Sequence, residues 1–300
     1  MHSVAEKVAA LKKERNAIIL AHNYTSPEVQ DLADHVGDSL GLSKIAAGTD
    51  ADVIVFCGVS FMGETAKVLC PSKTVLLPEP DAHCAMASMC SADEIRRLKA
   101  EHPGYIVVGY VNSTAEAKTE MDYCCTSSNA VPVVRSLGTD KVIFVPDANL
   151  GAYVASKIHR DIVLWDGYCP IHQCITVKQV ADMKARYPGA VVLAHPECRP
   201  EVLDMADYIG STEKIVSVAE ECPAETFIVL TEVGLLHKLE KRCPGKRFHF
   251  PPYAICTTMK MIEPESVLGA LQGEGNEVIL AEETIRRAYV PVKRMTDITE

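Results

Sequence analysis

An internal repeat of about 86 residues is the feature that most constrains how this chain can fold. Each of three successive segments contains three runs rich in Val and Ile, separated by helix-like stretches. In every segment the second run begins 35 or 36 residues after the first, and the third begins 20 to 22 residues after the second. The runs begin at Ile18, Val53 and Val75, at Ile106, Val142 and Ile162, and at Val191, Phe227 and Phe248.

Alternation of strand-like and helical segments is typical of α/β proteins with parallel sheets. We therefore predict an α/β fold of three similar parallel-sheet αβα domains arranged with pseudo-threefold symmetry. The predicted domains cover residues 1–86, 87–172 and 173–261. After residue 256 the pattern changes to two helices, near 264–272 and 281–295, and the first domain is the expected place for the C-terminal helices of residues 262–300 to pack.

Composition excludes several classes of function. The 300 residues carry a net charge of -10, which argues against binding to nucleic acid or to an anionic membrane surface. No apolar run reaches the roughly 18 residues of a membrane span, and charged residues interrupt the N-terminal stretch that a signal peptide would need. We expect a cytoplasmic protein with no nucleic-acid or membrane partner. A Rossmann dehydrogenase is disfavoured because no GxGxxG motif follows a predicted strand.

The chain contains 12 cysteines but no CxxC pair, which argues against zinc ribbons and thioredoxin-type motifs. The third run of each repeat is followed, 7 to 9 residues after its start, by Cys84, Cys169 or Cys256. Three thiolates that converge on one axis suit a [4Fe-4S] cluster with one iron left open, and a zinc ion is the alternative. An open iron can act as a Lewis acid on a substrate hydroxyl or carboxylate.

The other cysteines do not form a triplet. Cys90, Cys174 and Cys198 lie near the same loops and are rival ligands, whereas Cys124 and Cys125 are expected to pack in the core.

Polar residues follow the first run of each repeat. Because ligands bind beyond the carboxyl ends of parallel strands, and because alternate residues of an extended chain share a face, these residues predict a binding site. The equivalent positions are His22, Tyr110 and His195, each followed two residues later by a polar partner, namely Tyr24, Asn112 and Glu197.

A hydroxyl residue follows each of these positions after 17 residues, at Ser39, Ser127 and Thr212. Each precedes an apolar helical stretch, so the three hydroxyls fit helix N-caps. Three helix N-termini aimed at one centre would also bind carboxylates or phosphate through free N–H groups and positive dipole ends.

These residues and their surroundings resemble the quinolinate synthase family, and the resemblance extends over most of the chain. The stretches that carry it are IILAHNY (18–24), PEVQD (27–31), GDS (37–39), ADVIVF (51–56), FMGETAK (61–67), YVNSTAEAK (110–118), PDANL (146–150) and HPEC (195–198). A C-terminal CxxCxxC motif found in some members is absent, so no redox disulfide is expected there.

The resemblance implies three α/β domains around a pseudo-threefold axis and a [4Fe-4S] cluster held by one cysteine from each. It implies condensation of iminoaspartate with dihydroxyacetone phosphate to quinolinate, phosphate and water, for NAD biosynthesis. An L-aspartate oxidase or dehydrogenase that supplies iminoaspartate is the partner it suggests. By matching motifs, the cluster ligands would be Cys84, Cys169 and Cys256, and the substrate site would be lined by His22, Tyr24, Ser39, Tyr110, Asn112, Ser127, His195, Glu197 and Thr212.

Roles in that reaction follow from side-chain chemistry. Glu197 is the expected general base, because enediol and imine–enamine steps move a proton next to a carbonyl. His22 and His195 would bind an anion as cations or shuttle protons, and Tyr24 completes the expected catalytic group. Closure of a domain or loop would exclude water.

Two other functions remain open on the sequence alone. One is an iron-sulfur hydro-lyase that only dehydrates a hydroxy acid at an open iron. The other is a non-enzymatic repeat protein that binds a dicarboxylate and whose cysteines are merely buried.

Overall fold

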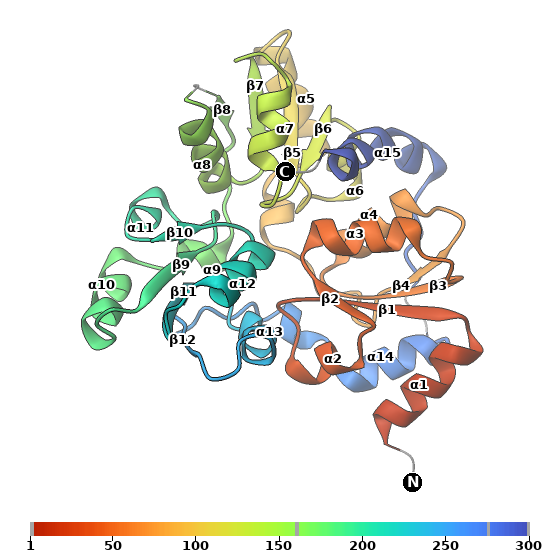
Figure 1. Ribbon diagram of the computed structural model, residues 1–300. Coiled ribbons are helices and arrows are strands. Elements are labelled where there is room, and N and C mark those ends of the chain that lie inside the picture. The colour runs from red at the N-terminus through yellow and green to blue at the C-terminus, as the bar shows by residue number, and fades with distance from the viewer. Residues whose placement is uncertain (1–2, 160–161, 275–276, 299–300) are drawn as a thin grey trace.

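The strands of the protein form three sheets, each with four parallel strands. This holds in the computed structural model, which describes residues 3–159, 162–274 and 277–298. The strand orders are β2-β1-β3-β4, β6-β5-β7-β8 and β10-β9-β11-β12, so all three sheets have the same order relative to the chain. Figure 1 shows the three α/β units gathered around a common centre. The predicted fold class is confirmed, while the pseudo-threefold symmetry stays a prediction.

Each unit alternates strands with helices as the repeat predicted. The first unit contains α1 (Val4–Glu14), β1 (Ala17–His22), α2 (Pro27–Leu32), β2 (His35–Gly37), α3 (Ser39–Gly48), β3 (Val53–Cys57), α4 (Ser60–Leu69) and β4 (Thr74–Leu76). The second contains α5 (Ala92–Glu101), β5 (Ile106–Tyr110), α6 (Ala115–Lys118), β6 (Tyr123–Cys125), α7 (Ala130–Ser136), β7 (Val142–Val145), α8 (Ala148–Ile158), β8 (Val163–Leu164) and α9 (Pro170–Gln173). The third contains α10 (Val177–Arg186), β9 (Val191–Ala194), α11 (Pro200–Leu203), β10 (Tyr208–Ile209), α12 (Thr212–Glu221), β11 (Thr226–Leu230), α13 (Leu235–Arg242) and β12 (Arg247–His249).

The inner strands form because their apolar runs can be covered on both faces. Every residue of β3 and β7 is buried, as expected for parallel strands between two helix layers. The buried apolar residues of the first two units form one continuous cluster, whereas those of the third form two clusters.

The sequence did not reveal the edge strands β2, β6 and β10. They contain only two or three residues each, too few for a side-chain period to be visible. Each pairs with the first long strand of its unit, which thus becomes an inner strand.

Two helices follow the third unit and extend back over the others. Helix α14 (Pro264–Gln272) packs against α1 and α2, and α15 (Glu282–Asp297) packs against α3 and α4 of the first unit and against β6 and α6 of the second (Figure 1). The predicted domain boundaries stay a prediction, and residues 1–2, 160–161, 275–276 and 299–300 of those ranges lie outside the described residues. Among the helices described, none combines the length and apolarity needed to traverse a bilayer.

Candidate active site and metal centre

One cavity, with about 1030 Å³ of empty space including part that is open to solvent, is lined by residues of all three units. Every residue of the predicted cluster-ligand set and substrate site lines it: His22, Tyr24, Ser39, Cys84, Tyr110, Asn112, Ser127, Cys169, His195, Glu197, Thr212 and Cys256. Residues up to 234 positions apart in the chain thus meet at one place, from His22 to Cys256. The fold brings together the whole set, although it does not by itself assign their roles.

The first strands of the units place the equivalent polar residues at the cavity. His22 is the last residue of β1, Tyr110 is the last residue of β5, and His195 directly follows β9. The strand register shows that these positions are equivalent. The residue before each one pairs with the last residue of the neighbouring strand, which is Cys57, Val145 or Leu230. The cavity therefore lies at the carboxyl ends of the strands, where parallel sheets bind ligands.

Glu197 is the most tightly held of these side chains and is 3% exposed. The Tyr110 hydroxyl donates a hydrogen bond to its Oε1, and His172 Nδ1 lies 2.7 Å from its Oε2. Burial raises the pKa of the Glu197 carboxyl. The nearby His172 and His195 side chains and the hydrogen bonds from His172 and Tyr110 lower it by more than burial raises it, so the net pKa lies below the ordinary value. Glu197 is therefore an ionised carboxylate in a dry site.

The two predicted histidines are buried and neutral. Burial lowers the pKa of His22 to about 3, although the Glu197 charge acts in the opposite direction. Burial lowers the pKa of His195 to about 3 as well, again against the Glu197 charge. Neutral imidazoles can give and accept protons, so these values favour proton transfer over the cationic role.

Hydrogen bonds across the cavity connect different units. The Tyr24 hydroxyl lies 2.7 Å from Thr231 Oγ1, and the Asn23 side-chain amide donates to Thr212 Oγ1 at 2.8 Å. These contacts tie the first unit to the third. His195 Nε2 lies 3.2 Å from the Ser127 hydroxyl, which ties the third unit to the second. Side chains that line the cavity thus also hold the units together.

The predicted hydroxyl residues line the cavity, but none of them is an N-cap. Asp38 caps α3 by accepting from Gly41 N at 2.8 Å, and Ser211 caps α12 by accepting from Lys214 N at 3.3 Å. Ser39 and Thr212 occupy the first helical position instead, and Ser127 lies before Asn129, the N-cap of α7. The prediction that these hydroxyl residues are N-caps was wrong by one or two positions, because neighbouring residues in the sequence also have side chains that favour N-cap positions. Since neighbours perform the capping, the Ser39 hydroxyl is available to the cavity, and the Thr212 hydroxyl, which accepts from Asn23, can still donate there.

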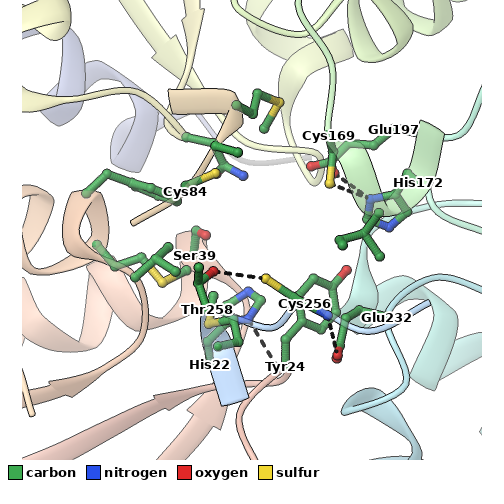
Figure 2. A pocket seen from close by; sticks show the side chains of 18 of the residues that line it. His22, Tyr24, Ser39, Cys84, Cys169, His172, Glu197, Glu232, Cys256 and Thr258 are labelled. Atoms are coloured by element: carbon green, nitrogen blue, oxygen red, sulfur yellow. Dashed lines mark hydrogen bonds and ion pairs between the residues drawn. The ribbon is translucent and has the colours of Figure 1, made fainter. Parts of the chain in front are cut away.

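Of the cysteines in the described parts of the chain, three line the cavity: Cys84, Cys169 and Cys256. Each is a half-buried free thiol, and Figure 2 shows their sulfur atoms on different sides of the space. Burial raises the pKa of the Cys84 thiol to about 12, and backbone N–H groups of Ala87 and Met86 act against this rise. Of the rival cysteines, Cys90 and Cys198 are buried elsewhere and Cys174 is exposed on the surface.

A second donor set overlaps the cysteine triplet. One ligand atom each of Cys169, His172 and Glu197 lies within 4.8 Å of the others. His172 Nδ1 is 3.1 Å from the Cys169 sulfur, so this imidazole lies between a thiol and the Glu197 carboxylate (Figure 2). A mixed S, N, O set of this kind suits a single zinc ion.

Reasoning from the sequence missed several buried residues at the cavity, and two of them, His172 and Glu232, are titratable groups that contact the cysteines. His172 is 1% exposed and lies three residues after Cys169. This spacing of about one helical turn could have predicted that His172 lies beside a candidate metal ligand. Glu232 lies two residues beyond the end of β11, as Asp147 does beyond β7. Aligning the repeats at their middle strands would have found both acidic residues.

The chain is similar to known proteins over nearly its whole length. Residues 6–297 match the family model described as "Quinolinate synthetase A protein". A protein of Methanosarcina barkeri named quinolinate synthase is 52% identical over 291 residues, which are 97% of this chain and 96% of the relative. Quinolinate synthases of Sulfurihydrogenibium sp. and Dehalococcoides mccartyi are 47% and 50% identical, with 98% or more of this chain and 98% of each relative covered.

Proposed function

The chain belongs to the quinolinate synthase family, and we propose that it condenses iminoaspartate with dihydroxyacetone phosphate to give quinolinate, phosphate and water for NAD biosynthesis. One observation carries this proposal. The three cysteines at equivalent places of the repeat are the only ones at a cavity that also gathers the nine polar residues expected to bind substrate. Membership of a family of enzymes argues against a non-enzymatic binding protein.

A [4Fe-4S] cluster fits the donors at the cavity. Cys84, Cys169 and Cys256 are free thiols, one from each unit, and none is consumed by a disulfide. Burial raises the pKa of the Cys84 and Cys169 thiols, and a bound metal would supply the positive charge that favours their thiolate forms. With three protein ligands the group would supply a Lewis acid that polarises a substrate oxygen.

Glu197 would act as the general base. Its carboxylate is ionised and buried, and the hydrogen bonds from Tyr110 and His172 fix its orientation. A fixed and desolvated carboxylate can remove a proton next to a carbonyl, a step that the condensation requires. His22 and His195, neutral in this environment, would pass protons between substrate and Glu197.

The remaining polar residues would position the two substrates. Asn112 Oδ1 is buried and has no hydrogen-bond partner within the described part of the chain, so it is an acceptor that a substrate N–H or O–H group can satisfy. The hydroxyls of Ser39 and Thr212, at the first positions of α3 and α12, would bind carboxylate or phosphate oxygens. Tyr24 and Ser127 complete the proposed binding set.

Chemical analysis and an assay test the proposal. Protein purified without oxygen is analysed for iron and acid-labile sulfide, and about four of each per chain are expected for the cluster. A single zinc ion would instead support the Cys169, His172 and Glu197 set. Quinolinate formation is then measured with each substrate omitted in turn. Absence of quinolinate together with dehydration of a hydroxy acid, a reaction that needs no dihydroxyacetone phosphate, would indicate the hydro-lyase alternative.

A further inference from the structure

The loops that carry the three cysteines are attached to the sheets in the same way. In each unit, the N–H of the third residue after the middle strand donates to the carbonyl two residues before the cysteine. These bonds are Ser60 N to Ala82 O at 2.8 Å, Ala148 N to Gly167 O at 2.8 Å, and Val233 N to Ala254 O at 2.9 Å. The backbone attachment of Cys84, Cys169 and Cys256 is therefore equivalent.

The side chain just before each donor is not equivalent. It is Val59 in the first unit, Asp147 in the second and Glu232 in the third. The register places all three two residues beyond Cys57, Val145 and Leu230, which occupy matching positions in the three sheets. Two of the three units thus place a carboxyl group at this point, and both groups are completely buried.

Glu232 connects the Cys256 loop to two other parts of the molecule. Its Oε1 accepts the backbone N–H of Cys256 at 3.1 Å, and its Oε2 accepts that of Gly234 at 2.6 Å (Figure 2). Lys260 Nζ lies 2.9 Å from Oε1 and also donates to the Tyr24 carbonyl of the first unit. Glu232 is the centre of a paired and hydrogen-bonded network.

Asp147 takes the corresponding place beside Cys169. Its Oδ1 accepts the N–H of Leu150 at 2.9 Å and so caps α8. Burial and the nearby Glu197 charge raise the pKa of the Asp147 carboxyl group well above its ordinary value. The Oδ2 atom has no hydrogen-bond partner within the described residues. A buried acidic group is costly for folding, which argues that this position has a use beyond the cap.

We propose that Glu232 is a positioning residue of the metal centre, which holds the backbone of Cys256 so that its sulfur atom faces the cavity, and that Asp147 has the same role at the matching position of the Cys169 loop. The proposal rests on the proposed cluster. Groups that orient metal ligands commonly change metal affinity by about 10- to 100-fold when they are removed. The first unit holds Cys84 without such a carboxyl group, because Val59 occupies the matching position.

Variants of Glu232 separate its hydrogen bonds from its charge. Glu232→Leu removes both, whereas Glu232→Gln keeps an oxygen that can accept from Cys256 N but removes the charge. Glu120→Gln is the matched control, because Glu120 is a buried carboxylate paired with Arg96 and Arg287 and does not line the cavity. Each protein is loaded with iron and sulfide without oxygen. Iron release to a chelator and the midpoint potential of the cluster are measured.

We expect Glu232→Leu to release iron about 10- to 100-fold faster than wild type. Glu232→Gln should release iron at nearly the wild-type rate but have a higher midpoint potential, because the lost negative charge no longer opposes reduction. Glu120→Gln should match wild type in both measurements. Asp147→Leu should release iron faster, as Glu232→Leu does.

Wild-type iron release in Glu232→Leu together with a wild-type potential in Glu232→Gln would overturn the proposal. Circular dichroism before loading shows whether Glu232→Leu folds. If it does not, the proposal is tested by the midpoint potential of Glu232→Gln and the iron release of Asp147→Leu, and wild-type values for both would overturn it. A wild-type protein that takes up no iron would instead refute the proposed cluster itself.

Discussion

His172 Nδ1 lies 2.7 Å from Oε2 of Glu197, although the two residues belong to different units of the repeat. The same nitrogen is 3.1 Å from the Cys169 sulfur. The other ring nitrogen of His172, Nε2, lies 2.9 Å from Thr231 Oγ1, so the imidazole has a hydrogen-bond partner at each nitrogen. The proposed base and a proposed metal ligand therefore share one buried histidine.

Removal of this imidazole should affect Glu197 more than substrate binding. We expect His172→Ala to lower kcat about tenfold or more with little change in KM, because the carboxylate loses the partner that orients it. His172→Asn can place an amide near the position of Nδ1 and should recover part of the rate. Steady-state kinetics of both variants provide the measurement. A rise in KM at unchanged kcat would contradict this role.

Glu197→Gln should leave the metal centre intact and abolish most turnover. The amide keeps the shape of the carboxylate but cannot accept the substrate proton, and loss of a general base costs about 10²- to 10⁴-fold in rate. Iron content is measured alongside quinolinate formation. Near-normal turnover at normal iron content would exclude Glu197 as the base.

Cys84→Ala should lose iron and activity together. Cys90→Ala is the control, because Cys90 is buried nearby in the sequence but does not line the cavity. We expect the control to bind iron as wild type does, since a thiol outside the cavity cannot reach the metal. A normal cluster in Cys84→Ala would remove Cys84 from the proposed ligand set.

Ser39 and Ser211 should respond oppositely to truncation. Ser39→Ala should raise KM without lowering stability, because Asp38 and not Ser39 caps α3. Ser211→Ala should destabilise the protein by about 1 kcal/mol, because Ser211 caps α12. Kinetics and thermal unfolding of both variants check this contrast. A stability loss in Ser39→Ala at unchanged KM would make that hydroxyl structural.

Much of the candidate site was predictable because residues at equivalent positions of the sequence repeat occupy equivalent positions in the three units. Residues at one phase of the repeat, such as His22, Tyr110 and His195, reach the same end of equivalent strands. Strand periodicity and parallel pairing are local enough to be read from one chain. The same holds for the cysteines that follow the third run of each unit.

Other features depended on the tertiary structure. The choice of Asp38 over Ser39 as a cap depends on a single backbone position, which residue preferences cannot resolve. The edge strands exist only because an inner strand is there to pair with them.

The sequence by itself determined the three-unit plan, the ends of the long inner strands and many of the polar residues that line the cavity. Only the tertiary structure decided how those residues pair, as in the contact of His172 with Glu197 and that of Lys260 with the Tyr24 carbonyl. The physical reason is that local periodicity sets the direction of a side chain within its own unit. Contacts between units depend on how separate sheets and helices pack against one another, which no spacing along the chain records.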